Sequence, residues 1–111
     1  MNISSIAARI VLPSFAVYSA TKAYVTHLSV SLRAELGAKG VRVSVIEPGI
    51  VSTELMDHVD NPGAKGWLAG AKQQMDFLEP EDVAEAIAFT VSAPTRMNVQ
   101  TLTLMPTGQA S

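Results

Sequence analysis

The segment Val41 to Glu47 constrains the fold of this chain more than any other stretch. Its β-branched residues predict a strand, and its alternating valines lie on one face of that strand. Ile46 adds apolar character to the opposite face, which is typical of a strand covered on both sides in a parallel sheet. Pro48-Gly49 then ends the strand. Because ligands bind at the carboxyl ends of strands in such sheets, this break is either an ordinary turn or the edge of a functional site.

Two helices are predicted to cover the sheet. The longer one runs from Tyr18 to about Lys39, carries an apolar stripe at helical spacing and ends at glycines. The shorter one begins at Pro80, continues with acidic residues that suit a helix N-terminus, and ends before Pro94. The stripe of the first comprises Val25, Leu28, Leu32 and Leu36, and the predicted buried face of the second comprises Val83, Ala84, Ile87, Ala88 and Val91.

Met1–Ser4 and Val99–Met105 predict the first and last strands. Hydrophobic residues make up 48% of the 111 residues and charged residues 16%, which favours one domain with a buried α/β interior over disorder. The net charge of −2 does not favour binding to the negatively charged backbone of a nucleic acid. The absence of cysteine excludes disulfides and thiolate zinc sites and fits a reducing, cytoplasmic compartment. No secretory signal and no membrane span is predicted.

The region from 52 to 79 lacks a strict period. Asn61-Pro62-Gly63 is a turn signal, and Gly66 and Gly70 are expected to interrupt any long helix. Loose packing is what a mobile cover over a substrate requires, so we favour a lid over a simple surface excursion.

Tyr18 and Lys22 are four residues apart, so on a helix they lie on one face, one turn apart. A free tyrosine has a pKa of about 10 and is a poor base at neutral pH, but a cation beside a phenol favours the phenolate. Ser5 could donate a hydrogen bond to a substrate carbonyl while Tyr18 gives or takes a proton. An aromatic residue at a helix edge beside a solvated lysine is the alternative. Because Ser5 precedes the pair and Pro48-Gly49 ends the following strand, we favour a proton-transfer and carbonyl-polarising site formed by Ser5, Tyr18 and Lys22.

Other patterns in the sequence give weaker evidence of function. Ser19-Ala20-Thr21-Lys22 fits the Ser-x-x-Lys pattern of penicillin-recognising acyl transferases, but the companion Ser-Asp-Asn and Lys-Thr-Gly elements are absent. His27 and His58 are solitary, so no metal site is expected. Glu47 is unusual in an apolar strand, and its expected partner is Arg42 or a backbone amide.

Three segments resemble consecutive signatures of the short-chain dehydrogenase/reductase family: Asn2–Ala7, Tyr18–Ala23 and Val45–Thr53. The tail Pro106–Gln109 resembles the branch that contains NADP-dependent 3-hydroxy acid and serine dehydrogenases. The resemblance implies that residues 1–111 form the C-terminal catalytic part of one domain, with 52–79 as its lid. Its fold would be a three-layer α/β/α fragment of a Rossmann-like, doubly wound parallel sheet, holding the last three strands.

The resemblance also implies reversible hydride transfer between NADP (or NAD) and a secondary alcohol or carbonyl, a small-molecule substrate. Tyr18 would be the catalytic acid/base, Lys22 would favour the phenolate and hold the nicotinamide ribose, and Ser5 would orient the carbonyl. The nicotinamide end of the cofactor would be lined by Pro48, Gly49, Ile50, Val51 and Thr53, with Tyr18 and Lys22 beside it.

Family members run to roughly twice this length. Here Met1 is expected inside the fifth strand, and the 111 residues contain no glycine-rich turn opening a helix and no counterpart of the catalytic Asn. The cofactor-binding half is therefore expected to be missing and the chain to be inactive alone. The alternative is a non-catalytic fragment that only associates with other chains. A homo-oligomer through the Tyr18–Lys39 helix is expected in either case.

Overall fold

The computed structural model describes residues 1–52 and 62–109. Its three-stranded sheet has the order β1-β2-β3 with both pairs parallel, where β1 is Asn2–Ile3, β2 is Val45–Pro48 and β3 is Thr101–Leu104. Asn2 lies opposite Val45, which lies opposite Thr101. The predicted parallel sheet is therefore confirmed, with shorter strands than expected.

The approach to β2 shows why this strand starts late. The Asn98 side chain accepts from the Val43 amide at 3.0 Å and donates to the Val43 carbonyl at 2.8 Å. A side chain thus replaces the backbone ladder at this point. The residues ahead of Val45 are held against the chain that leads into β3 without becoming part of the sheet.

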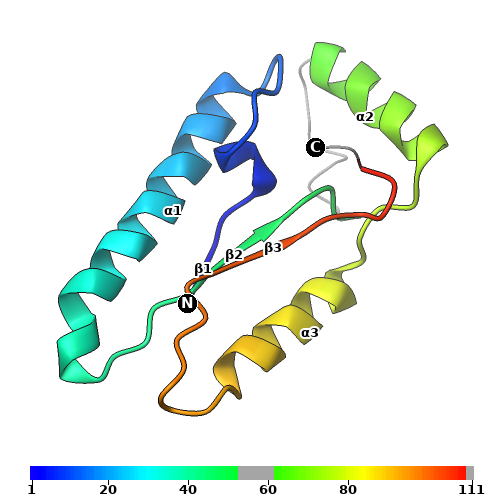
Figure 1. The fold of residues 1–111 in the computed structure, drawn as a ribbon. Helices are drawn as coiled ribbons and strands as arrows, with labels where there is room; N and C mark the ends of the chain where they lie inside the picture. Colours follow the sequence, from blue (N-terminus) through cyan, green and yellow to red (C-terminus); the bar gives the residue numbers. More distant parts are fainter. Residues whose placement is uncertain (53–61, 110–111) are drawn as a thin grey trace.

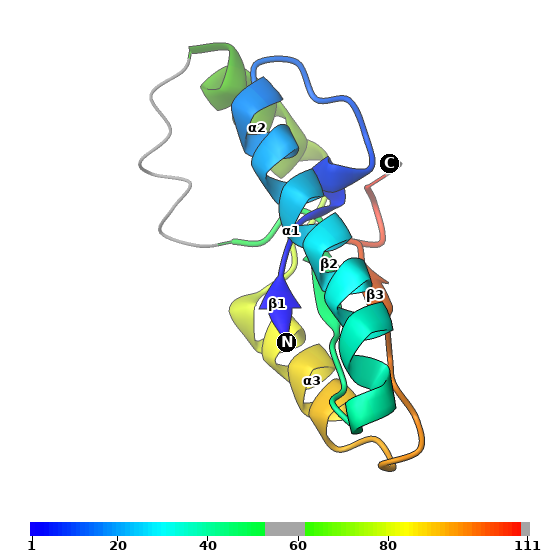
Figure 2. The ribbon, with the colours of Figure 1, turned by 90° about the vertical axis from the view of Figure 1, so that its left-hand side faces the viewer.

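The sheet lies between two helices, α1 (Ala16–Leu36) on one face and α3 (Pro80–Val91) on the other (Figures 1 and 2). The strand between them is closed off from water, since Val45 and Ile46 are both 0% exposed. The predicted three-layer α/β arrangement and the strand covered on both faces are confirmed. Two short 3-10 helices, η1 (Ile6–Ala8) and η2 (Gly37–Lys39), precede and follow α1.

The long helix matches its predicted range closely but packs differently from the prediction. Its most buried residue is Ser29, at 1% exposed, whereas Leu28 is 38% exposed. The Ser29 hydroxyl accepts from the side-chain amide of Asn2 at 2.9 Å, so a polar contact joins the helix to β1. Gly40 has φ 76° and closes the helical region in the left-handed conformation, as expected of a C-terminal glycine.

The buried face of α3 differs from the predicted one. Ala86 and Thr90 are buried, while Ala84, Ala88 and Val91 are exposed. The predicted face already had helical spacing, but the observed face is rotated around the helix axis, with Val83 and Ile87 half-buried beside Ala86 and Thr90. Thr90 is tolerated inside because its hydroxyl donates to the Ala86 carbonyl at 2.9 Å. The predicted start at Pro80 is confirmed, and the Glu79 amide donates to the Asp82 carboxylate at 2.8 Å.

A third helix, α2 (Pro62–Gln74), was not predicted. It runs through Gly66 and Gly70 without interruption, and Pro62 begins the helix where a turn was expected. Each glycine costs a helix only about 1 kcal/mol, and proline is tolerated in the first turn. None of the described helices is both long and apolar enough to cross a membrane.

Candidate active site

Tyr18 and Lys22 lie together near the start of α1. The Lys22 ammonium is 5.6 Å from the centre of the Tyr18 ring. Lys22 also lies within 3.4 Å of the Ile3 carbonyl, which links it to the end of β1. The Tyr18 side chain remains accessible, with 41% of the residue exposed. A phenol and an ammonium therefore share one accessible face of the helix.

Ser5 lies just past β1, at the start of the turn η1, and η1 packs against α1. Its backbone is extended (φ −164°, ψ 156°) and its hydroxyl accepts from the Ala7 amide at 3.1 Å. Ser4 points the other way, and its hydroxyl donates to the Lys22 carbonyl at 2.8 Å. The Ser4 contact thus holds the strand that carries Ser5 against the helix that carries Tyr18.

The segment after β2 is closely packed. The Gly49 amide donates to the Leu104 carbonyl at 2.6 Å, and the Ile50 amide donates to Gln109 Oε1 at 3.1 Å. A Cβ at Gly49 would lie 2.5 Å from that same Gln109 oxygen. A side chain at this position would force Gln109 or Pro106 to move. Val51 is bridged to Leu78 as an isolated parallel pair.

Four of the five residues predicted to line the cofactor therefore follow one another at the carboxyl end of β2. They are Pro48, Gly49, Ile50 and Val51. Thr53 lies outside the described residues.

An aromatic contact joins α2 to this region. The Phe15 ring lies 6.2 Å from the Tyr18 ring and 6.0 Å from the Trp67 ring, edge to face in both cases. Phe15 precedes α1 and Trp67 belongs to α2. The helix that the sequence did not predict is therefore tied to the residue before the Tyr18 helix.

Comparison with known proteins identifies the family to which this chain belongs. Residues 1–103 match the family model described as enoyl-(acyl carrier protein) reductase. The chain is 39% identical over 94 residues to the NADP-dependent 3-hydroxy acid dehydrogenase YdfG of Escherichia coli strain K12, covering 85% of this chain and 38% of that protein. A short-chain type dehydrogenase/reductase from Mycobacterium ulcerans superposes with a TM-score of 0.73 at 31% identity, over 93% of this chain and 38% of that one. The chain belongs to the short-chain dehydrogenase/reductase family.

A closed form of serine dehydrogenase complexed with NADP+ is also similar, with a TM-score of 0.86 and 37% identity over 99% of this chain and 44% of that one. The chain thus spans about two-fifths of the length of these short-chain dehydrogenase/reductase relatives.

Glu47 was recognised as unusual, but its partner was predicted wrongly. It is 0% exposed, and its Oε1 accepts from Arg9 Nε at 2.6 Å. The Arg42 side chain instead donates to backbone carbonyls at the end of α3 and just beyond it, at Val91, Ala93, Pro94 and Met97. A charge in a buried strand signals a partner, but a sequence separation of 38 residues gives no sign of which one.

Ser19 does not form the acyl-transferase arrangement. Its hydroxyl is buried and has no hydrogen-bond partner among the described residues, so no hydrogen bond to Lys22 activates it. The orphaned hydroxyl follows Tyr18 directly in the chain.

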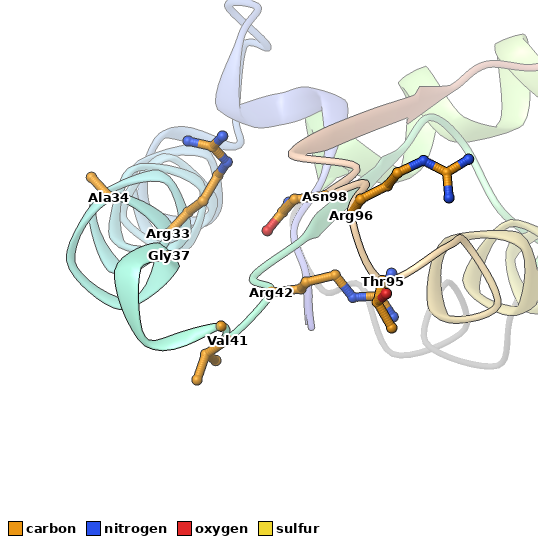
Figure 3. A pocket seen from close by; sticks show the side chains of 9 residues that line it. Arg33, Ala34, Gly37, Val41, Arg42, Thr95, Arg96 and Asn98 are labelled. Atoms are coloured by element: carbon orange, nitrogen blue, oxygen red, sulfur yellow. The ribbon is translucent and has the colours of Figure 1, made fainter.

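A pocket of about 310 Å³ lies at the other end of the sheet, before β2 and β3 begin. Figure 3 shows the guanidinium groups of Arg33 and Arg96 on opposite sides of it rather than converging on one point. Arg42, also in the pocket wall, donates to the Val91 carbonyl at the end of α3 and to the Ala93 carbonyl just beyond it. The pocket is lined by Arg33, Ala34, Gly37, Gly40, Val41, Arg42, Thr95, Arg96 and Asn98, and it is remote from Tyr18 and Ser5.

Proposed function

We propose that this chain carries the proton-transfer and carbonyl-orienting groups of an NADP-dependent oxidoreductase that interconverts a secondary alcohol and a carbonyl. The observation that carries this proposal is the Lys22 ammonium beside the Tyr18 ring, next to the turn that begins at Ser5. The names of the relatives support NADP as the cofactor, with NAD as the alternative.

The donors present fit a nicotinamide nucleotide. An ammonium has three N–H donors, and among the described residues the Lys22 ammonium donates one hydrogen bond, at 3.4 Å, so donors remain for ribose hydroxyls. The residues Pro48–Val51 would line the nicotinamide end, at the carboxyl edge of the sheet where such ligands bind. When bound, the nicotinamide supplies or accepts the hydride.

The side chains of this chain would move the proton and hold the substrate. Tyr18 gives its phenolic proton to the substrate oxygen as the carbonyl is reduced, and takes it back in the oxidation. The Lys22 ammonium lies beside the Tyr18 ring, where its positive charge would face the negative charge left on Tyr18 after the proton has moved. The Ser5 oxygen already accepts from the Ala7 amide, so its own proton is available to the substrate oxygen.

The test uses a chimera in which these 111 residues follow the N-terminal portion of the Escherichia coli 3-hydroxy acid dehydrogenase. Tyr18→Phe should lower kcat by at least about 10²-fold, the usual contribution of a general acid or base. NADPH binding, followed by nicotinamide fluorescence, should persist. Tyr24→Phe, at an exposed tyrosine on the same helix, is the matched control and should leave kcat unchanged. Normal turnover by Tyr18→Phe would show that Tyr18 is not the proton donor.

The isolated 111-residue chain should neither turn over alcohols nor bind NADPH measurably, because it holds no glycine-rich turn to cradle the phosphates. Turnover by the purified chain would refute this part of the proposal.

A second candidate function is association without catalysis, in which the outward face of α1 is an interface. Val17 is 82% exposed and Tyr24 is 67% exposed on that helix. Large apolar side chains that are exposed together often mark a site of association with another protein. Size-exclusion with light scattering should show a homo-oligomer, and Tyr24→Lys should dissociate it. A monomer at all concentrations would exclude this role.

A further inference from the structure

The Glu47 carboxylate has no part in the chemistry proposed above, yet it joins three elements. Its Oε1 accepts from Arg9 Nε at 2.6 Å and from the Thr103 hydroxyl of β3 at 3.0 Å. Its Oε2 accepts from the Thr26 hydroxyl of α1 at 2.9 Å. A side chain at 0% exposure on the central strand is a costly place for a charge unless its partners are fixed.

One arm of this network leads to Ser5. Arg9 ends the turn η1, where its amide donates to the Ile6 carbonyl at 2.9 Å. Ser5 caps the beginning of the same turn through the Ala7 amide. Glu47 therefore holds the far end of the turn whose near end carries the substrate-orienting hydroxyl.

The other arm leads to Lys22. The Thr26 hydroxyl lies 2.7 Å from the Ser4 hydroxyl, and Ser4 donates to the Lys22 carbonyl at 2.8 Å. Thr26 is one turn beyond Lys22, on the face of α1 that meets the sheet. This arm fixes α1 along its own axis against the strand that carries Ser5.

We propose that Glu47 is the positioning residue of the site: its hydrogen bonds hold the Ser5 turn through Arg9 and the Tyr18–Lys22 helix through Thr26 and Ser4 at a fixed spacing. The effect of this spacing on catalysis rests on the proposed function, whereas the hydrogen bonds are independent of it.

A count of protons indicates which variants to use. Three oxygen–oxygen contacts lie between Glu47 and the Lys22 carbonyl, but only the Thr26 and Ser4 hydroxyls supply protons to them, since a carboxylate supplies none. A glutamine could keep its oxygen toward Arg9 and Thr103 and donate from its amide to Thr26. Glu47→Gln should therefore keep the spacing, whereas Glu47→Leu has the bulk but none of the hydrogen bonds.

The test is amide hydrogen exchange, followed by NMR in the 111-residue chain. In Glu47→Leu we expect protection of the Ala7 and Arg9 amides to fall about tenfold, since a buried hydrogen-bonded anchor has been removed. The β2–β3 ladder amides, such as Gly49, report global stability and should change less than about threefold. Glu47→Gln should match the wild type in both sets, and Glu35→Leu, at an exposed glutamate of α1, is the matched control.

Arg9→Met keeps the test decisive if Glu47→Leu does not fold. Its side chain is 52% exposed, and the change cuts only the arm to the turn. In this variant we expect the same selective loss of hydrogen-exchange protection at the amides of positions 7 and 9. An equal loss at the turn and the ladder in these variants, or no loss at the turn, would mean that Glu47 is only a stabilising core residue and would overturn the proposal.

Kinetics in the chimera separate this proposal from the proposed function. Glu47→Leu should lower kcat about tenfold with the KM for NADPH within twofold, and Glu47→Gln should restore kcat. If Tyr18→Phe remains active, the proposed function fails while hydrogen exchange still judges the positioning. If Tyr18→Phe is inactive but Glu47→Leu has wild-type kcat, only the positioning role is overturned.

Discussion

Lys22 places its ammonium 5.6 Å from the centre of the Tyr18 ring, one turn further along the same helix. The spacing of four residues brings both side chains to the same face of the helix. The ammonium also lies within 3.4 Å of the Ile3 carbonyl, so α1 and β1 both define its place.

Lys22→Met in the chimera should lower kcat by about 10²-fold or more, because the phenolate loses the cation that favours it. NADPH should also bind more weakly, as a donor to the ribose is lost. Steady-state kinetics and fluorescence titration measure the two effects. Lys39→Met, at an exposed lysine beyond the end of α1, is the control. Unchanged kcat in Lys22→Met would remove Lys22 from the mechanism.

Gly49→Ala should destabilise the chain, because the new Cβ would lie 2.5 Å from Gln109 Oε1 and 2.9 Å from Pro106 Cδ. Forcing extra atoms into close packing costs about 1–3 kcal/mol of unfolding free energy. Urea unfolding followed by circular dichroism measures it. Gly66→Ala is the matched control: among the described residues, nothing outside the neighbouring backbone of α2 lies within 4 Å of its Cβ position, so the chain should gain about 0.5–1 kcal/mol. Equal effects at both glycines would contradict the packing argument.

The parts of the fold that could be predicted are those that local patterns define. The buried strand at Val45 and Ile46, the Tyr18 helix and the start of α3 at Pro80 each follow from residue type and period within a short window. The unpredicted helix α2 shows where that reasoning fails. Glycine at two of its positions disfavours a helix locally, but Ala71 is buried and the Trp67 ring packs on Phe15, and such tertiary contacts outweigh a small local preference.

In the candidate site, too, the relationships within one helix could be predicted and those between distant segments could not. Tyr18 and Lys22 could be placed together from sequence because one helix carries both. The Arg9–Glu47 pair could not, since it joins residues 38 apart through a fold that only the whole sheet determines. Ser4 was passed over for the same reason: its contact with the Lys22 carbonyl spans β1 and α1, and no local pattern distinguishes it from Ser5.

Gly40→Ala should cost about 1–2 kcal/mol, because φ there is 76° and a Cβ disfavours the left-handed region. Apart from its two chain neighbours, none of the residues that the structure describes comes within 4 Å of the Cβ position, so the cost is conformational and not steric crowding. Gly37→Ala provides the contrast in the same turn, since its φ of −57° suits any residue. It should be neutral or stabilising by about 0.4–1 kcal/mol. Thermal or urea unfolding of the pair tests this, and a destabilised Gly37→Ala would contradict it.

Trp67→Ala in the chimera should raise the KM for the carbonyl substrate while changing kcat little. The Trp67 ring is 6.0 Å from Phe15, which in turn lies 6.2 Å from Tyr18, so it ties α2 to the approach to the site. Losing an edge-to-face aromatic contact costs about 0.5–1.5 kcal/mol, which corresponds to about a two- to tenfold rise in KM. Phe89→Ala, at an exposed aromatic residue of α3, which lies on the face of the sheet away from α1 (Figure 1), should leave KM unchanged. If both variants shift KM equally, α2 does not cover the substrate, because the effect would then come from a general loss of stability and not from the contact beside Tyr18.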